Sequence, residues 1–211
     1  MEKCGANLWR YKIKFEVIIA KQGSKKGAYI AFPTTRKELW NKLKAVGASR
    51  NDWELIGVKT GSNVFGDAVM SCRNLDEMSY LGHCFEKFDS EDEYHFFFEL
   101  CEAGCAEGQS IDAYITLALN LKNYFRLDGV SCIEDLGECV VKEQLKKHGD
   151  DIPEILDIYR EDFKNIGNSV AQKFHGNFMN GNFYGCFPSN LRYNGEESEI
   201  PDYALIDSLP L

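Results

Sequence analysis

Acidic side chains carry the most promising chemistry in this sequence, because they recur on one face of several predicted helices. In the helix expected after Ser131, apolar residues at helical spacing form one face, and these are Ile133, Leu136 and Val140. Carboxylates lie within an arc of roughly 100° on the opposite face, at about 100° per residue. One face would pack while the other presents negative charge, and an ordinary solvated helix face is the competing interpretation.

Two further segments repeat this arrangement. A capping box formed by Ser90 and Glu93 begins one helix, and Pro153 is well placed to begin another. In both helices the acids fall opposite the apolar positions. Together with an acid near the end of the helix predicted over 75–88, the candidate surface carboxylates are Glu86, Glu91, Asp92, Glu99, Glu102, Glu134, Asp135, Glu138, Glu154, Asp157 and Glu161. We expect those of 86–102 and 134–161 to form one continuous negative ribbon.

Side chains that could hold a metal or act as a nucleophile are present but poorly arranged. Cys101 and Cys105 are one helical turn apart near His95, yet a glycine interrupts the turn and the paired spacing of zinc motifs is absent. His83 and Cys84 lack the local signature of a nucleophile pair, and a packed helix face is the simpler interpretation. We therefore expect no catalytic residues, no metal site and no cofactor.

Composition places the chain among globular proteins of a reducing compartment. The 8 cysteines are scattered without a C-x-x-C pair, which favours reduced thiols. The most apolar stretch near the N-terminus, Phe15–Ala20, is too short for a signal-peptide core and contains Glu16. No apolar run approaches the roughly 18 residues of a membrane helix. The sequence therefore predicts a cytoplasmic protein without a membrane segment.

Charge is distributed unevenly within the net value of -9. Residues 1–50 carry 12 Lys and Arg against 3 Asp and Glu, whereas residues 51–211 carry 12 against 30. A carboxylate-rich surface repels nucleic acid and attracts basic sites. The short clusters Lys25-Lys26 and Arg36-Lys37 leave open a nucleic-acid-binding role for the N-terminal part, with a solvated basic surface as the alternative.

The order of elements predicts an α+β protein made of small units. The expected strands of the first unit are Phe15–Ala20, Ala28–Phe32 and Trp53–Lys59, with a helix between the last two that Thr34 or Thr35 can cap. The divisions are a β-β-α-β unit at 13–66, an acidic helical unit at 67–112, a mixed α+β unit at 113–187, and a loosely packed acidic tail at 188–211.

Local signals mark several boundaries in the third unit. Alternating apolar residues over 115–121 predict a half-buried strand, although a short helix also fits. A turn is expected at Asp128-Gly129, followed by a capping box over Ser131–Glu134. Asn180-Gly181 is a typical two-residue hairpin turn, and Gly149-Asp150 predicts a break before the Pro153 helix.

Read together, these segments resemble the ArdA antirestriction family. The resemblance begins at Val17–Phe32, with the sequence VIIAKQGSKKGAYIAF, and covers roughly residues 13–187. Its most specific part is Leu119–Glu138, where N-L-x-x-Y leads to D-G-V and then E-D-L-G-E. The remaining similar segments, in order, are 75–100, 115–144, 158–171 and 176–185.

The resemblance implies a binding protein and not an enzyme. Family members are DNA mimics made by mobile elements, and they occupy the DNA groove of type I restriction–modification complexes with carboxylates in place of phosphates. It also implies an elongated chain of three small units, two mixed α/β units flanking a helical one, and a homodimer assembled through the last unit. On this basis, the candidate carboxylates would be phosphate mimics, the partner would be a type I methyltransferase and specificity complex, and no direct contact with nucleic acid is expected.

The chain departs from the family pattern in several places. The 13–66 unit has 10 bases and 4 acids, whereas family members are usually acidic throughout. The acidic helices of the third unit also carry Lys142, Lys146 and Lys147. Gly167-Asn168-Ser169 stands where Gly-Arg-Asp is frequent, and Cys139 where an aromatic is common. The alternatives are a nucleic-acid-binding or regulatory protein of a mobile element, acting through its basic N-terminal unit, and an enzyme that uses His83 or a cysteine.

Overall fold

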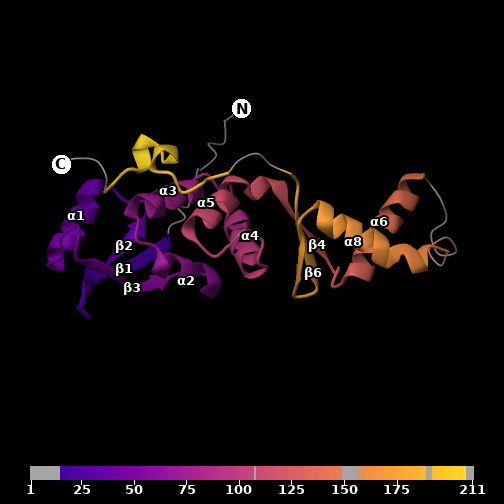
Figure 1. The fold of residues 1–211 in the computed structure, drawn as a ribbon, viewed down its shortest axis with the longest axis horizontal. Helices are drawn as coiled ribbons and strands as arrows, with labels where there is room; N and C mark the ends of the chain where they lie inside the picture. The colour runs from indigo at the N-terminus through magenta and orange to yellow at the C-terminus, as the bar shows by residue number, and fades with distance from the viewer. Residues whose placement is uncertain (1–14, 107, 149–155, 157, 189–191, 208–211) are drawn as a thin grey trace, which may run out of the picture.

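The computed structural model describes residues 15–106, 108–148, 156, 158–188 and 192–207, and Figure 1 shows an elongated molecule. The described chain combines helices with two three-stranded antiparallel sheets, which confirms the α+β class. The N-terminal sheet lies toward one end of the long axis, and a pair of helices, α6 (Ile133–His148) and α8 (Phe163–Lys173), lies at the other. None of the described helices is long and apolar enough to cross a membrane.

The N-terminal sheet has one packed face and one open face. Its strands are β1 (Phe15–Lys21), β2 (Gly27–Phe32) and β3 (Trp53–Lys59), with β1 in the centre. Phe15, Val17 and Ile19 on β1 are fully buried, whereas Glu16 and Ile18 between them are only partly covered. Successive side chains of a strand point to opposite faces, so this alternation separates the core side from the open side.

Helix α1 (Arg36–Ala45) completes the β-β-α-β unit, and its start confirms the predicted cap. The hydroxyl of Thr35 accepts a hydrogen bond of 3.2 Å from the backbone N–H of Glu38. Such a cap satisfies one of the amides that the first helical turn leaves without a partner. Gly47, with φ of 71°, follows the helix, as expected for a residue in the left-handed region after a helix end.

A single hydrophobic core runs from this sheet into the helices that follow. These helices are α2 (Asn63–Ser71), which the sequence patterns did not reveal, α3 (Leu75–Phe85), α4 (Glu91–Glu102) and α5 (Ile111–Leu119). Phe65 of α2 is fully buried at the centre. Its ring lies 5.4 to 6.0 Å, between centroids, from the rings of Phe15, Phe85, Phe97, Phe98 and Tyr114. The core therefore crosses the boundary drawn between residues 66 and 67.

The strand predicted over 115–121 is wrong, and the helical alternative is correct. Most of the segment belongs to α5, and a short 3-10 turn over Leu121–Asn123 ends it. Helix α5 is buried on most sides, through Ile111, Ala113, Tyr114, Ile115, Leu117 and Ala118. A helix covered on most sides is apolar all round, so the sequence loses the 3.6-residue period that identifies a surface helix.

The second sheet consists of β4 (Tyr124–Asp128), β6 (Asn182–Cys186) and β5 (Asn177–Met179), with β6 in the centre. Asn180 and Gly181 connect β5 to β6 with φ angles of 51° and 78°. Positive φ at both central residues is the geometry that a type I′ hairpin turn requires, so the predicted hairpin is confirmed. The turn predicted after β4 is also present, with Gly129 at a φ of 74°.

Helices α6 and α8 cross at two glycines. A Cβ atom placed on Gly137 would lie 1.9 Å from the carbonyl oxygen of Phe163, and one placed on Gly167 would lie 1.9 Å from that of Ile133. The two backbones therefore touch at this crossing, with no room for a side chain. This contact fixes the direction of α6, which carries three of the candidate carboxylates.

The expectation of a loosely packed tail is wrong for its described residues. Tyr193, Ile200, Ala204 and Ile206 are at most 4% exposed and belong to the main core. The carboxylate of Asp76, itself 4% exposed, accepts hydrogen bonds from the backbone N–H groups of Ile206 and Asp207, the latter at 2.7 Å. Figure 1 shows this segment running back along α3 toward α1. A buried acceptor that is 131 residues away in sequence holds the tail in place.

Candidate functional site

The acidic face of α4 is held outward by the apolar residues on its other side. Its buried residues are Phe97, Phe98, Leu100 and Cys101. The hydroxyl of Ser90 accepts a bond of 3.2 Å from the Glu93 N–H, as predicted. The Glu93 carboxylate accepts in return from the N–H of Asp89, at 2.7 Å, one residue before the cap. This reciprocal box fixes the first turn, where Glu91 and Asp92 are exposed and favourably placed for the helix dipole.

Arg126 ties α4 to the second sheet and neutralises part of its acidic face. Its guanidinium lies 2.6 Å from a carboxylate oxygen of Glu99 and 2.6 Å from one of Asp128. The hydrogen bond to Glu99 raises the pKa of Arg126. The hydroxyl of Tyr184 also donates to Glu99, at 3.4 Å. Glu99, predicted as part of a negative ribbon, therefore positions the sheet against α4.

Two other candidate carboxylates are also engaged within the protein. The Glu86 carboxylate lies 3.0 Å from Nδ1 of His83, one helical turn earlier. Glu102 accepts a hydrogen bond of 2.5 Å from the hydroxyl of Ser62, which caps α2 by accepting from the Phe65 N–H. Both acids therefore support local structure, and Glu102 joins the end of α4 to the start of α2.

On α6, Asp135 closes the capping box in place of Glu134. The Ser131 hydroxyl donates to the Asp135 carboxylate at 2.5 Å, and the Ser131 N–H donates to it at 3.0 Å. The prediction that Glu134 closes the box is wrong, because the carboxylate of Asp135 reaches Ser131 instead. Hydrogen bonds from the Ser131 hydroxyl and N–H lower the pKa of Asp135. Further along the helix, Glu138 pairs with Lys142 at 2.5 Å.

Three of the candidate acids remain for an external partner. Asp92, Glu134 and Glu161 are exposed, and none of them makes an ion pair or a side-chain hydrogen bond with a described residue. Glu161 lies in a 3-10 turn, Arg160–Asp162, immediately before α8. Glu91 approaches only the exposed His95, at 3.7 Å. Glu154 and Asp157 lie outside the described residues.

The expected negative ribbon is interrupted by paired bases. Lys122 lies 2.6 Å from Asp89, and Arg126 and Lys142 occupy carboxylates on α4 and α6. The sequence patterns did not indicate Asp89 and Asp128 as partners of Lys122 and Arg126, because neither acid follows a helical period. Asp128 immediately precedes Gly129 of the predicted turn. This position in a turn is the one local signal that Asp128 is exposed.

The candidate nucleophiles are held in unreactive positions. Cys84 is buried, which raises its pKa to about 12, and its neighbour His83 is turned to Glu86. Burial also raises the pKa of Cys101, and that of Cys105 to about 11. These thiols stay protonated at neutral pH, whereas nucleophilic attack requires the thiolate. Over the described ranges, no group of three or more His, Cys, Asp or Glu side chains could hold a metal ion.

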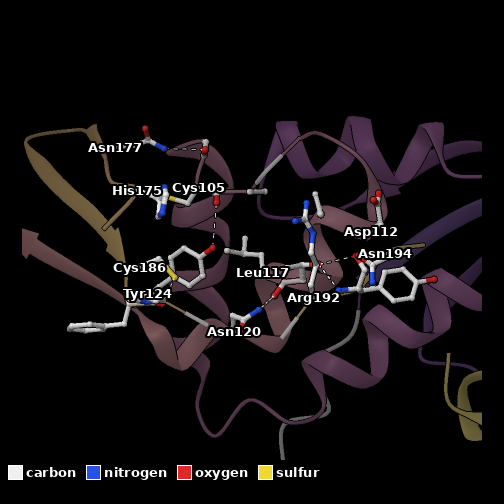
Figure 2. Close-up of a pocket in the computed structure, with 17 residues that line it drawn as sticks. Cys105, Asp112, Leu117, Asn120, Tyr124, His175, Asn177, Cys186, Arg192 and Asn194 are labelled. Atoms are coloured by element: carbon white, nitrogen blue, oxygen red, sulfur yellow. Dashed lines mark hydrogen bonds between the residues drawn. The ribbon is translucent and has the colours of Figure 1, made fainter. Parts of the chain in front are cut away.

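A cleft of about 630 Å³ lies where α5 meets the second sheet and residues 192–194 (Figure 2). The Tyr124 hydroxyl donates to the carbonyl of Cys105 at 3.4 Å, and the Asn177 amide donates to that of Gly104 at 3.1 Å. The imidazole of His175, also in the lining, makes no hydrogen bond with a described residue. The polar groups of this cleft therefore hold the turn after α4 against the sheet.

Comparison with models of known protein families and with curated proteins finds no match for the chain.

Proposed function

We propose that this chain is a cytoplasmic DNA-mimic antirestriction protein of the ArdA kind, which inhibits type I restriction–modification enzymes by binding and not by catalysis. The observation that carries the proposal is that three of the candidate acids, Asp92, Glu134 and Glu161, are exposed and have no partner among the described residues, on α4, on α6 and in the turn before α8 of an elongated body (Figure 1). Buried residues on the other face of each helix hold the backbones of Asp92 on α4 and Glu134 on α6, and Glu161 lies in the 3-10 turn immediately before α8.

The physics of a DNA-binding groove makes such a surface effective. A groove built for DNA is lined with Lys and Arg, and much of its affinity comes from neutralising phosphates. Carboxylates one helical turn apart are spaced by roughly 5–6 Å along the helix axis. We propose that the chain works as three units in series, with the helical unit and the third unit supplying these contacts. The bases paired with Asp89, Glu99 and Glu138 reduce the charge of that surface.

Reversing these three candidate acids tests the proposal. The triple variant Asp92→Lys, Glu134→Lys and Glu161→Lys should bind a type I methyltransferase core about 30-fold more weakly, since about 0.7 kcal/mol is lost at each exposed site. Asp135 is left intact because it caps α6. The measurement is titration calorimetry of the purified proteins, with circular dichroism to confirm folding.

A matched control reverses three exposed acids elsewhere, Glu38, Glu196 and Asp202, with the same change of net charge. We expect this control to retain most of the affinity. Duplex DNA should compete with the wild-type protein for the same site, and added salt should weaken the complex. Equal weakening by both triple variants would show that only net charge matters. If the test variant is folded and binds like the wild type, Asp92, Glu134 and Glu161 are not part of the binding site.

We also propose that the third unit forms the interface of a homodimer. Large apolar side chains are unusually exposed there, with Ile158 at 74%, Phe187 at 52% and Tyr159 at 41%. Light scattering at micromolar concentration should give twice the chain mass of 24.0 kDa. Ile158→Glu should shift it toward one chain mass, because a charge would be buried at the interface. Tyr203→Glu, at a tail residue 57% exposed, is the control, and a monomeric wild type contradicts the proposal.

A further inference from the structure

The open face of the N-terminal sheet is an apolar platform that no described helix covers. The packed face holds the buried residues of all three strands, among them Ile19, Ile30 and Leu55, and it is the side that α1, α2 and α3 contact. On the open face Tyr29 of β2 is 61% exposed and Ile56 of β3 is 38% exposed. Ile18 of the central strand lies opposite Tyr29 in the register and is partly covered.

Two glycines keep this platform flat. A Cβ atom on Gly27 would lie 2.5 Å from Cγ2 of Ile18 and 3.0 Å from Cδ1 of Ile56. The side chain of Ile56 therefore extends over the central strand toward β2. Gly57 lies opposite Ile18 on the other side, where a Cβ would come within 3.1 Å of Cδ1 of Ile18. Isoleucines fill the space above the glycines, so the tyrosine ring stands at the edge of a low apolar surface.

The lysines beside the platform are available to an anion. Lys25 and Lys26 lie in the hairpin loop between β1 and β2, are exposed, and form no ion pair with any described residue. The acids of the open face are themselves engaged: Glu16 pairs with Lys59 at 3.3 Å, and Glu54 accepts from the Gly23 N–H at 2.8 Å. Three bases of the acidic half, Lys122, Arg126 and Lys142, are paired with acids.

We propose that this face binds single-stranded nucleic acid, with a base stacked on Tyr29 and the backbone phosphates beside Lys25 and Lys26. Proteins that bind single strands combine exposed aromatic rings with unpaired cations, because every base has a π-face for stacking and every nucleotide has a phosphate. Bases in a duplex are already stacked on one another and cannot reach a ring on a flat sheet. The site lies far from α6 and α8 along the molecule, so it adds a second function to the proposed mimicry (Figure 1).

Fluorescence anisotropy of the full chain with a labelled oligodeoxythymidine of about 15 nucleotides tests the proposal. Tyr29→Ala should weaken binding by at least about fivefold through loss of stacking, and it should leave the salt dependence unchanged. Lys25→Ala with Lys26→Ala should also weaken binding, and it should reduce the slope of log K against log salt by about 1.4, or about 0.7 for each phosphate that is no longer neutralised. The two effects separate stacking from charge.

Matched variants elsewhere should leave binding unchanged. Tyr203→Ala replaces another exposed tyrosine, and Lys147→Ala with Lys164→Ala removes two exposed lysines of the third unit. Equal affinity for a duplex of the same length would overturn the proposal, because phosphate contact alone would then explain binding. Absence of binding at low salt, or a concentration-dependent self-association that Tyr29→Ala abolishes, would overturn it too. The triple acid reversal described above should not weaken this binding, so the two proposals can fail independently.

Discussion

Replacing Gly137 or Gly167 with alanine is expected to destabilise the packed pair α6 and α8 by about 2–3 kcal/mol, although alanine is normally the better helix former. Helix propensity alone favours alanine over glycine by about 1 kcal/mol. Here the added Cβ would lie 1.9 Å from a backbone carbonyl oxygen of the facing helix. A backbone atom cannot rotate away, so α6 and α8 must separate, and overpacking typically costs about 1–3 kcal/mol or more. The steric cost therefore exceeds the propensity gain and reverses the sign.

Urea unfolding of the two variants, followed by circular dichroism, measures this change, and amide hydrogen exchange locates it in α6 and α8. Asn168→Ala is the matched control, because residue 168 is exposed on the same helix beside Gly167. That control should be neutral or slightly stabilising. If Gly137→Ala stabilised the protein by about the propensity difference, the close crossing of the helices would be refuted. On the proposed mimicry, binding to the methyltransferase core should also weaken in the glycine variants, because α6 carries Glu134.

Phe65→Ala is expected to cost about 3–5 kcal/mol, the range for removing a large buried aromatic side chain. The ring is fully buried and touches aromatic rings from β1, α3, α4 and α5. Truncation removes the transfer free energy of the ring and leaves a cavity that these neighbours cannot all fill. Because the contacts join the sheet to the helices, β1 and α4 should lose stability together.

Hydrogen exchange of β1 and α4 amides distinguishes a shared core from separate units. In Phe65→Ala, protection of both elements should fall by the same free energy. Phe187→Ala serves as the control, since that ring is 52% exposed and lies in the third unit, and it should cost much less. A variant in which α4 loses protection while β1 keeps it would show that residues 13–66 fold independently of residues 67–112.

Signals within a few residues of one another predicted much of the local structure. Thr35 caps α1, Ser90 caps α4, and Asn180-Gly181 turns the hairpin, as the sequence indicated. Each feature depends on a side chain bonding to its own neighbourhood or on a backbone angle that few residues adopt. The strands of the first unit were also indicated locally, as short apolar stretches bounded by turn residues.

The partners of the acids were decided by tertiary structure. The sequence placed Glu99 on the exposed side of α4, but the sheet that brings Arg126 to it is formed by residues 27 positions away. Helical spacing therefore could not show that Glu99 is paired within the protein. The choice between Glu134 and Asp135 in the cap depends on a shorter-range feature. The direction of each side chain decides which carboxylate reaches Ser131, and it is that of Asp135.

Packing over long distances also settled what periodicity left open. The apolar pattern of residues 115–119 fits either a strand or a buried helix. The segment is a helix, α5, whose side chains are covered on most sides by neighbouring elements. The tail is ordered by Asp76, a carboxylate 131 residues away from the amide of Asp207. Gly137 and Gly167 become essential only because two helices touch there. Such contacts depend on how the whole chain packs, whereas caps and turns depend on a few adjacent residues.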